Sequence, residues 1–299
     1  MEEDILQQKQ PAIKQTWLRI LLFLLTYLAS STILGLIPVV VMILTGTISI
    51  EELQASAGNI GGNFILIISQ ITSFIAVALS IWIFRKFVDR KSIFSLGFEI
   101  KGKSKDVILG FLVGFFLLFL GFLILNFSNQ LTVTGTNFVA NDLIISLIIF
   151  IIVAVVEEVM FRGYVLNNLM GWLKNKYIAL LISALIFALF HGINPNISLL
   201  GFINLILAGF ALGITYIHTK NLWFPIFLHI SWNYFQGPIF GFEVSGLNTN
   251  SLINHDLLGS DLITGGEFGF EGSILLSFLL VAMVVVTDRV LVKRPANLN

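Results

Sequence analysis

The chain has 299 residues, of which 57% are apolar or aromatic and only 11% are charged, whereas an ordinary soluble domain has roughly 25% charged residues. This composition argues strongly against a water-soluble fold. The 17 basic and 17 acidic residues cancel, so no overall positive charge would attract nucleic acid. Cysteine is absent, which excludes disulfides, thiolate metal ligands and a thiol nucleophile.

Apolar runs of the length needed to cross a membrane recur along the whole chain. A helix needs about 20 apolar residues to span roughly 30 Å of hydrocarbon. Of the runs given next, the fifth is the shortest. We therefore predict an all-α polytopic membrane protein with about eight transmembrane helices, at residues 17–44, 64–84, 107–127, 143–166, 177–193, 198–217, 222–242 and 273–292.

Lys and Arg are concentrated in alternate connections between these runs. Residues 45–63, 128–142 and 236–272 contain neither, whereas residues 85–106 contain Arg85, Lys86, Arg90, Lys91, Lys101, Lys103 and Lys105. Because cytoplasmic loops are the basic ones, the pattern predicts that both chain ends and the loop 85–106 lie on the cytoplasmic side. The long connection at 248–272 is then expected to be an irregular extracytoplasmic loop. His255 in that loop and His218 in a short turn are expected to be solvated.

Two pairs of glycines lie four residues apart within the predicted spans. They are Gly110 with Gly114 and Gly209 with Gly213. This spacing lets the backbones of neighbouring helices approach closely. We expect both pairs to mark helix packing rather than ligand binding.

Charged residues within the spans are few, and three of them lie together in the fourth. Such groups cost about 2.5–3.5 kcal/mol each on insertion scales, so Glu157, Glu158 and Arg162 need an explanation. Glu158 and Arg162 have the spacing and order that favour an ion pair on one helix face. Glu157 lies about 100° around the helix and has no second cation to pair with. The ion pair could simply fix a helix contact, but two adjacent carboxylates sharing one Arg favour a reactive site.

Two later spans carry polar groups at a comparable depth. His191 ends the fifth run, and His229 and Asn233 share one face of the seventh. Taken singly, each could be a helix cap or an interhelical hydrogen-bonding group. At 1.5 Å per residue, Glu157, His191, His229 and Asn233 lie about 14, 21, 10 and 16 Å from the cytoplasmic ends of their spans. All four therefore fall in the middle part of a core about 30 Å thick and can converge on one buried site.

The ordered set of motifs resembles those of the CPBP family, also called Abi. The residues that carry the resemblance are Glu157-Glu158-x-x-x-Arg162, Phe187-x-x-x-His191 and His229-x-x-x-Asn233. This family includes the type II CAAX prenyl endopeptidases and bacterial bacteriocin-processing or self-immunity proteins. The resemblance implies a catalytic helical core at residues 143–237. Three spans and the basic loop would precede it in residues 1–142, and an extracytoplasmic loop and a last helix would follow in residues 238–299.

The resemblance implies an intramembrane endopeptidase of the glutamate type, acting without a cofactor on a membrane-associated peptide or protein in the lipid bilayer. Glu157 would activate water, His191 would hold it, and His229 and Asn233 would donate to the oxyanion. Glu158 and Arg162 would hold the helix and tune Glu157. Peptide hydrolysis needs a base, oxyanion donors and a proton for the leaving amine, and these residue types can supply all three.

Two other interpretations stay open. Glu157, His191 and His229 could together bind a divalent ion such as zinc, although the HExxH motif of helix-borne zinc proteases is absent. A non-enzymatic protein could instead use the glutamates as a proton relay in transport, or act in bacteriocin immunity by binding. Residues 144–156 are almost entirely apolar, which disfavours a relay. The expected location is a cell membrane, with the bacterial cytoplasmic membrane favoured.

Overall fold

The computed structural model describes residues 10–55 and 64–292, and helices dominate it. The α-helices are α1 (Thr16–Leu44), α2 (Ile50–Ala55), α3 (Phe64–Ile83), α4 (Ser104–Phe127), α5 (Ala140–Glu158), α6 (Asn167–Trp172), α7 (Lys176–Phe190), α8 (Leu199–Gly213), α9 (Tyr216–Thr219), α10 (Trp223–Tyr234), α11 (Asp261–Thr264) and α12 (Ile274–Val292). Three π-helical segments continue α3, α5 and α10, namely η1 (Phe84–Asp89), η3 (Val159–Leu166) and η4 (Phe235–Ile239). Short 3-10 turns are η2 (Ile93–Leu96), η5 (Gly266–Phe268) and η6 (Phe270–Gly272), and the strands are β1 (Leu131–Thr136) and β2 (Ile253–Leu257).

The fold class is confirmed as an all-α polytopic membrane protein, but the spans differ in length. All eight predicted runs are helical, and six helical segments of the described chain are long and apolar enough to cross a membrane. The fifth run forms only the 15 residues of α7, because Asn175 caps its start and the chain turns at His191. The seventh forms the 12 residues of α10, followed by the five of η4. The predicted number of about eight transmembrane helices is therefore corrected for the described residues, where six helical segments are long enough to cross a membrane and α7 and α10 are shorter.

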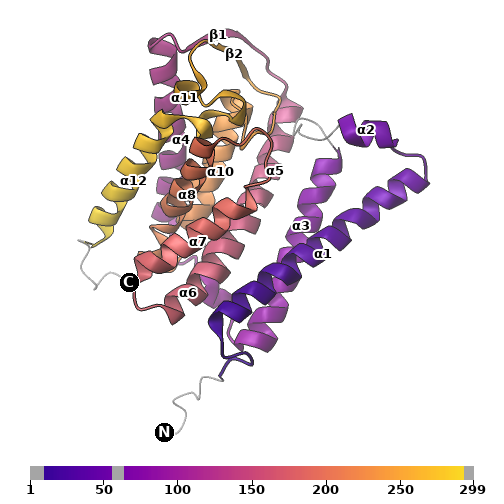
Figure 1. The fold of residues 1–299 in the computed structure, drawn as a ribbon, viewed down its shortest axis with the longest axis vertical. Coiled ribbons are helices and arrows are strands. Elements are labelled where there is room, and N and C mark those ends of the chain that lie inside the picture. Colours follow the sequence, from indigo (N-terminus) through magenta and orange to yellow (C-terminus); the bar gives the residue numbers. More distant parts are fainter. Residues whose placement is uncertain (1–9, 56–63, 293–299) are drawn as a thin grey trace.

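Helix α10 lies at the centre of the bundle and packs against α4, α5 and α8. Helices α7 and α12 pack on α8, while α1 pairs with α3, which contacts α5. In Figure 1 the α1 and α3 pair lies on one side of the molecule and α12 on the other. The region between α5, α7, α8 and α10 therefore lies between these two outer parts of the bundle. The four candidate residues come from this region or its edge.

The glycine pairs pack helices closely, as their spacing predicts. A Cβ atom at Gly110 would overlap the carbonyl oxygen of Phe224 in α10, and one at Gly114 would lie 2.8 Å from the Ser231 Cβ. On α8, a Cβ at Gly209 would lie 2.7 Å from that of Ala184 in α7. These glycines therefore set how closely α4 and α8 approach their neighbours.

The substitution Gly110→Ala is expected to destabilise the protein by about 1–3 kcal/mol, the usual cost of overpacking, because the new methyl group meets backbone that cannot move aside. Gly171→Ala in α6 is the matched control, since a Cβ there has no neighbour within 4 Å. It should be neutral or slightly stabilising. Thermal unfolding of both variants in detergent measures the difference, and equal midpoints would contradict this account of the contact between α4 and α10.

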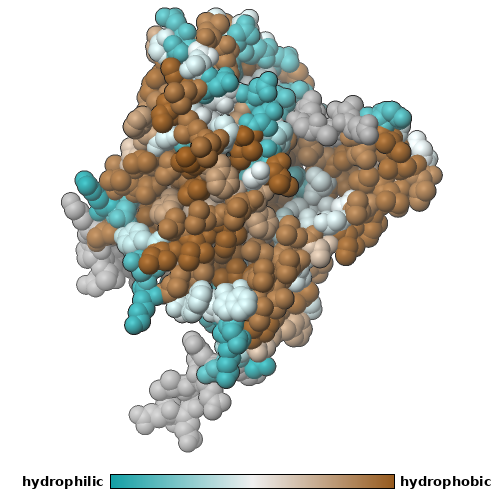
Figure 2. Space-filling model, in the orientation of Figure 1, coloured by the Kyte–Doolittle hydropathy of each residue, from teal (hydrophilic) through white to brown (hydrophobic). Residues whose placement is uncertain are grey.

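One end of the bundle gathers the basic connections, and we call it the basic end. There the start of α1 is joined to η1 by an ion pair between Arg19 and Asp89 at 2.6 Å. The loop before α4 is joined to the loop before α10, because Asn221 donates to the carbonyl oxygen of Glu99 at 2.8 Å. Figure 2 shows an apolar band across the middle of the molecule with hydrophilic side chains at both ends. This arrangement fits the predicted cytoplasmic side, although Lys293 and Arg294 lie outside the described residues.

The expectation that His218 is solvated is wrong. Its side chain is only 9% exposed, and its Nε2 lies 2.7 Å from a carboxylate oxygen of Asp288 in α12. Its Nδ1 lies 3.0 Å from the Lys176 ammonium group, which donates to it. These contacts join α9 to α7 and α12. Their partners are too far apart in the sequence for a local pattern to predict the contacts.

The opposite end of the bundle contains more regular secondary structure than the predicted irregular loop. Strands β1 and β2 pair antiparallel there, with Leu131 opposite Leu257. His255 on β2 is half-buried, with its ring 4.8 Å from that of Phe242, and burial lowers the pKa of its imidazole. Next to α12, Gly269 adopts φ of 84°, where a Cβ would overlap the carbonyl oxygen of Glu243. This turn brings η6 inward, toward the centre of the bundle.

Candidate active site

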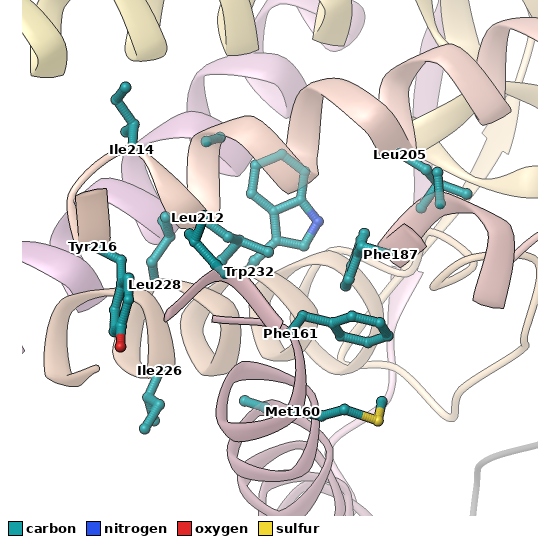
Figure 3. Packing of buried hydrophobic residues seen from close by; sticks show 14 of the residues in the cluster. Met160, Phe161, Phe187, Leu205, Leu212, Ile214, Tyr216, Ile226, Leu228 and Trp232 are labelled. Carbon is teal, nitrogen blue, oxygen red and sulfur yellow. The ribbon is translucent and has the colours of Figure 1, made fainter. Parts of the chain in front are cut away.

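A cavity of about 320 Å³ lies among α1, α3, α5, α7, α8, α10 and α12, and Glu157, His191, His229 and Asn233 all line it. Most of its other walls are apolar. Figure 3 shows Met160, Phe161, Phe187, Leu205, Leu212, Leu228 and Trp232, which belong to these walls. The cavity therefore combines a few polar groups with mainly hydrophobic surroundings, as ligand and substrate sites usually do.

Glu158 and Arg162 form the ion pair that their spacing predicts. The Nη1 of Arg162 donates to Oε1 of Glu158 at 2.7 Å, and both side chains are almost completely buried. The Nη2 of Arg162 donates to the carbonyl oxygen of Gly209 in α8 at 3.2 Å. The guanidinium also lies over the Phe187 ring, 4.7 Å from its centroid. Arg162 thereby joins the end of α5 to both α7 and α8.

Glu158 also holds His229. Its Oε1 accepts a hydrogen bond from Nδ1 of His229 at 2.9 Å. A histidine fixed at Nδ1 presents its other ring nitrogen in a defined direction, and Nε2 of His229 lies 3.9 Å from Oε2 of Glu157. The two neighbouring carboxylates therefore differ in role, because Glu158 binds Arg162 and His229 whereas Glu157 faces the cavity.

His191 approaches Glu157 from α7. Its Nδ1 lies 2.8 Å from the carbonyl oxygen of Phe187, one turn earlier, to which the N–H donates. Its Nε2 is 3.6 Å from Oε2 of Glu157. This oxygen has no hydrogen-bond partner within the described residues. A water molecule in the cavity could lie beside these two atoms and contact both.

Asn233 lies one helical turn beyond His229 on α10 and is only 5% exposed. Its side chain lines the same cavity. The sequence placed both residues on one helix face, and the fold turns that face toward Glu157. A buried amide can donate a hydrogen bond to a group that enters the cavity.

Glu271 is a cavity residue that sequence reasoning missed. It lies in η6, where its carboxylate accepts hydrogen bonds from Nε1 of Trp232 at 3.2 Å and from Oγ of Ser245 at 2.6 Å. Burial raises the pKa of this carboxyl. In the sequence it was one acidic residue among several in a loop, and only its place just before the last apolar run distinguishes it.

Asn204 in α8 and Gln70 in α3 are polar residues within apolar helices, where such side chains commonly hydrogen-bond between helices. Asn204 does so, since its amide donates to the carbonyl oxygens of Glu271 and Ser273, each at 2.8 Å. It supports η6 and is not among the residues that line the cavity. Gln70, in contrast, lines the cavity from α3.

The structure shows how the proposed metal ligands Glu157, His191 and His229 are arranged. Within residues 10–55 and 64–292, no group of three or more His, Cys, Asp or Glu side chains is arranged so that it could hold a metal ion. His229 uses Nδ1 on Glu158, which leaves Nε2 of both histidines and one oxygen of Glu157 as the donors nearest one another.

Comparison with known families finds a similarity in the central part of the chain. Residues 138–235 match the family Rce1-like, described as type II CAAX prenyl endopeptidase Rce1-like. This segment is CAAX protease-like. It covers about a third of the chain, nearly the same third as the predicted core at 143–237, and it contains all six residues of the candidate site. A search of the curated proteins found no match. The CAAX protease-like segment implies a hydrolase of the intramembrane protease type.

Proposed function

We propose that this protein is an intramembrane endopeptidase that hydrolyses a peptide bond in a membrane-associated peptide or protein, with Glu157 as the general base. The observation that carries the proposal is the position of the Glu157 carboxylate. One of its oxygens lacks a hydrogen-bond partner among the described residues and lies between two imidazole nitrogens, in a cavity with mainly apolar walls. A carboxylate held in this way is suited to take a proton from water.

The attacking water would lie between Glu157 and His191. Because Nδ1 of His191 donates to a backbone carbonyl, the neutral ring has an unprotonated Nε2 that can accept a hydrogen bond from this water. Glu157 takes the second proton as the oxygen attacks the peptide carbon. The same carboxyl can then return this proton to the leaving amine, so that no external acid is needed.

His229 and Asn233 are the proposed donors to the oxyanion. Since Nδ1–H of His229 already donates to Glu158, donation through Nε2 requires a ring protonated on both nitrogens. That imidazolium makes the summed charge of Glu157, Glu158, Arg162 and His229 zero. Donors directed at developing negative charge typically lower the activation free energy by about 2.7–4 kcal/mol each.

The test is a comparison of cells expressing the wild-type protein with cells expressing Glu157→Gln at matched levels of folded protein. New peptide termini in the membrane proteome and in the released peptides are measured. Termini that appear only with the wild type are expected, and they identify the substrate at the same time.

A different result would favour a protein that acts by binding. If no termini depend on Glu157, and Glu157→Gln confers the same phenotype as the wild type, the endopeptidase proposal is wrong. Bacteriocin immunity or transport would then account better for the buried glutamates. Size-exclusion chromatography and thermal unfolding of the purified variant show whether it is folded.

Metal dependence is a separate prediction. We expect purified protein to retain its peptidase activity after treatment with 1,10-phenanthroline, because one carboxylate and two histidines suffice for the proposed steps. Activity measured before treatment, after it and after addition of zinc checks this. Loss with the chelator and recovery with zinc would instead support the alternative in which Glu157, His191 and His229 bind the metal.

The proposed substrate is a membrane peptide or small membrane protein. Apolar cavity walls suit a hydrophobic segment, and no feature of the chain distinguishes a prenyl group from an apolar side chain.

We also propose that the protein is in the bacterial cytoplasmic membrane, with its basic end facing the cytoplasm. The distribution of Lys and Arg supports this orientation.

A further inference from the structure

A group of cations surrounds an open concavity at the basic end, far in sequence from the CAAX protease-like segment. We call it the basic concavity, and its walls are Trp82, Arg85, Lys86, Arg90, Lys91 and Ile93. It lies where α3 passes through η1 into the loop before α4. The proposed hydrolysis does not use any of these residues.

The cations of the basic concavity outnumber the acidic groups near them. Asp89 is completely buried, and its two oxygens bind Arg19 at 2.6 Å and Arg85 at 3.1 Å. Within the part of the chain that the structure describes, Lys86, Arg90 and Lys91 form no ion pair with a carboxylate. Burial, together with the nearby Arg85 charge, lowers the pKa of Lys91. An anion placed here would offset the repulsion among these cations.

The shape of the basic concavity is held by the backbone and by Arg85. The N–H of Lys91 donates to the carbonyl oxygen of Arg85 at 2.9 Å, and Arg90 between them adopts a left-handed conformation with φ of 57°. The Arg85 guanidinium donates to the carbonyl oxygen of Ser92 at 3.1 Å and to the hydroxyl of Ser95. The site is therefore formed before any ligand arrives.

Exposed apolar side chains adjoin these cations. Trp82 is 45% exposed and Phe87 is 52% exposed, with the Lys86 ammonium group 5.1 and 5.3 Å from their ring centroids. Ile93 and Phe94 are also exposed. Trp and basic side chains together mark the boundary between hydrocarbon and headgroups. A soluble anion would use only the cations, whereas a phospholipid would use both kinds of surface.

We propose that the basic concavity binds the phosphate group of an anionic phospholipid. Lys86, Arg90 and Lys91 contact the phosphate, and the acyl chains lie against Trp82, Phe87 and Ile93. Arg85 is a positioning residue, because its guanidinium is already bound to Asp89 and to the loop. Basic pockets beside transmembrane helices on the cytoplasmic side suit such headgroups.

The experiment uses the full chain purified with phosphatidylglycerol and phosphatidylcholine in equal amounts, followed by native mass spectrometry of the bound lipid. The triple variant Lys86→Gln/Arg90→Gln/Lys91→Gln removes the proposed contacts. Lys101→Gln/Lys103→Gln/Lys105→Gln is the matched control, because it removes the same charge from the same loop outside the concavity. At about a fivefold contribution per cation near the membrane surface, the first variant should bind phosphatidylglycerol about 100-fold more weakly. The control should retain it.

Each other outcome would contradict the proposal. Equal losses in the two variants would mean a diffuse attraction by the loop, and no loss in either would mean that the concavity is not a lipid site. Thermal unfolding in detergent, with inorganic phosphate added in place of lipid, distinguishes a phospholipid headgroup from a soluble phosphate ion as the ligand. If millimolar phosphate stabilises the wild type as much as phosphatidylglycerol does, the site takes a soluble anion and the lipid proposal is wrong. Matched unfolding midpoints of the two variants show that both are folded.

Discussion

Replacing Glu157 with Gln is expected to lower the rate of peptide hydrolysis about 10²- to 10⁴-fold, the usual contribution of a positioned general base, while the protein stays folded. The Glu157 side chain is 20% exposed, and its Oε2 has no hydrogen-bond partner in the described part of the chain. An amide of the same shape therefore leaves no other buried group without its partner. The rate is measured in proteoliposomes, with the substrate found through its Glu157-dependent termini.

Glu158→Gln is the matched comparison, because it makes the same chemical change one residue along. Glu158 binds both Arg162 and His229, so this variant should lose stability as well as activity. If Glu157→Gln cleaved the substrate at the wild-type rate, Glu157 would not be the base. If it unfolded as readily as Glu158→Gln, Glu157 would be a structural residue.

The second large effect is expected for Arg162→Met, which should destabilise the protein by about 3–5 kcal/mol. Removing the guanidinium leaves the fully buried Glu158 carboxylate without its cation and the Gly209 carbonyl without its donor. Denaturant unfolding in detergent micelles measures this loss. Arg289→Met, at an exposed position in the last turn of α12, should have almost no effect.

A double variant separates charge from packing in this prediction. Replacing both members of a buried ion pair with apolar residues usually costs much less than removing one, so Glu158→Leu/Arg162→Met should be more stable than Arg162→Met alone. It should nevertheless be inactive, because His229 loses the carboxylate that orients it. A double variant less stable than the single one would mean that packing, and not an unpaired charge, dominates at this position.

Several parts of the site could be predicted from the sequence because they depend on positions within one helix. The pair of Glu158 with Arg162 and the shared face of His229 and Asn233 both follow from the helical repeat. The different faces of Glu157 and Glu158 follow in the same way. The predicted depths of Glu157, His191, His229 and Asn233 used only the rise of 1.5 Å per residue, and the structure brings these four residues to one cavity.

Glu271 and His218 could not be predicted in this way. Glu271 enters the cavity only because η6 turns inward beside Trp232, and Trp232 is 39 residues earlier in the chain. His218 is buried because α12 brings Asp288 to it from 70 residues away. Neither residue lies in a periodic pattern, so composition and spacing gave no sign of their partners.

By itself, the sequence determined that the protein belongs in a membrane, where its helices lie and which polar residues share a helix face, because these depend on local composition and on the helical repeat. Only the tertiary structure decided that α7 and α10 are shorter than full spans and that Glu158 binds His229 while Glu157 faces the cavity. It also decided that Lys86, Arg90 and Lys91 surround one concavity. The physical reason is that a contact between helices depends on their rotation and distance, which are set by packing among residues far apart in the chain.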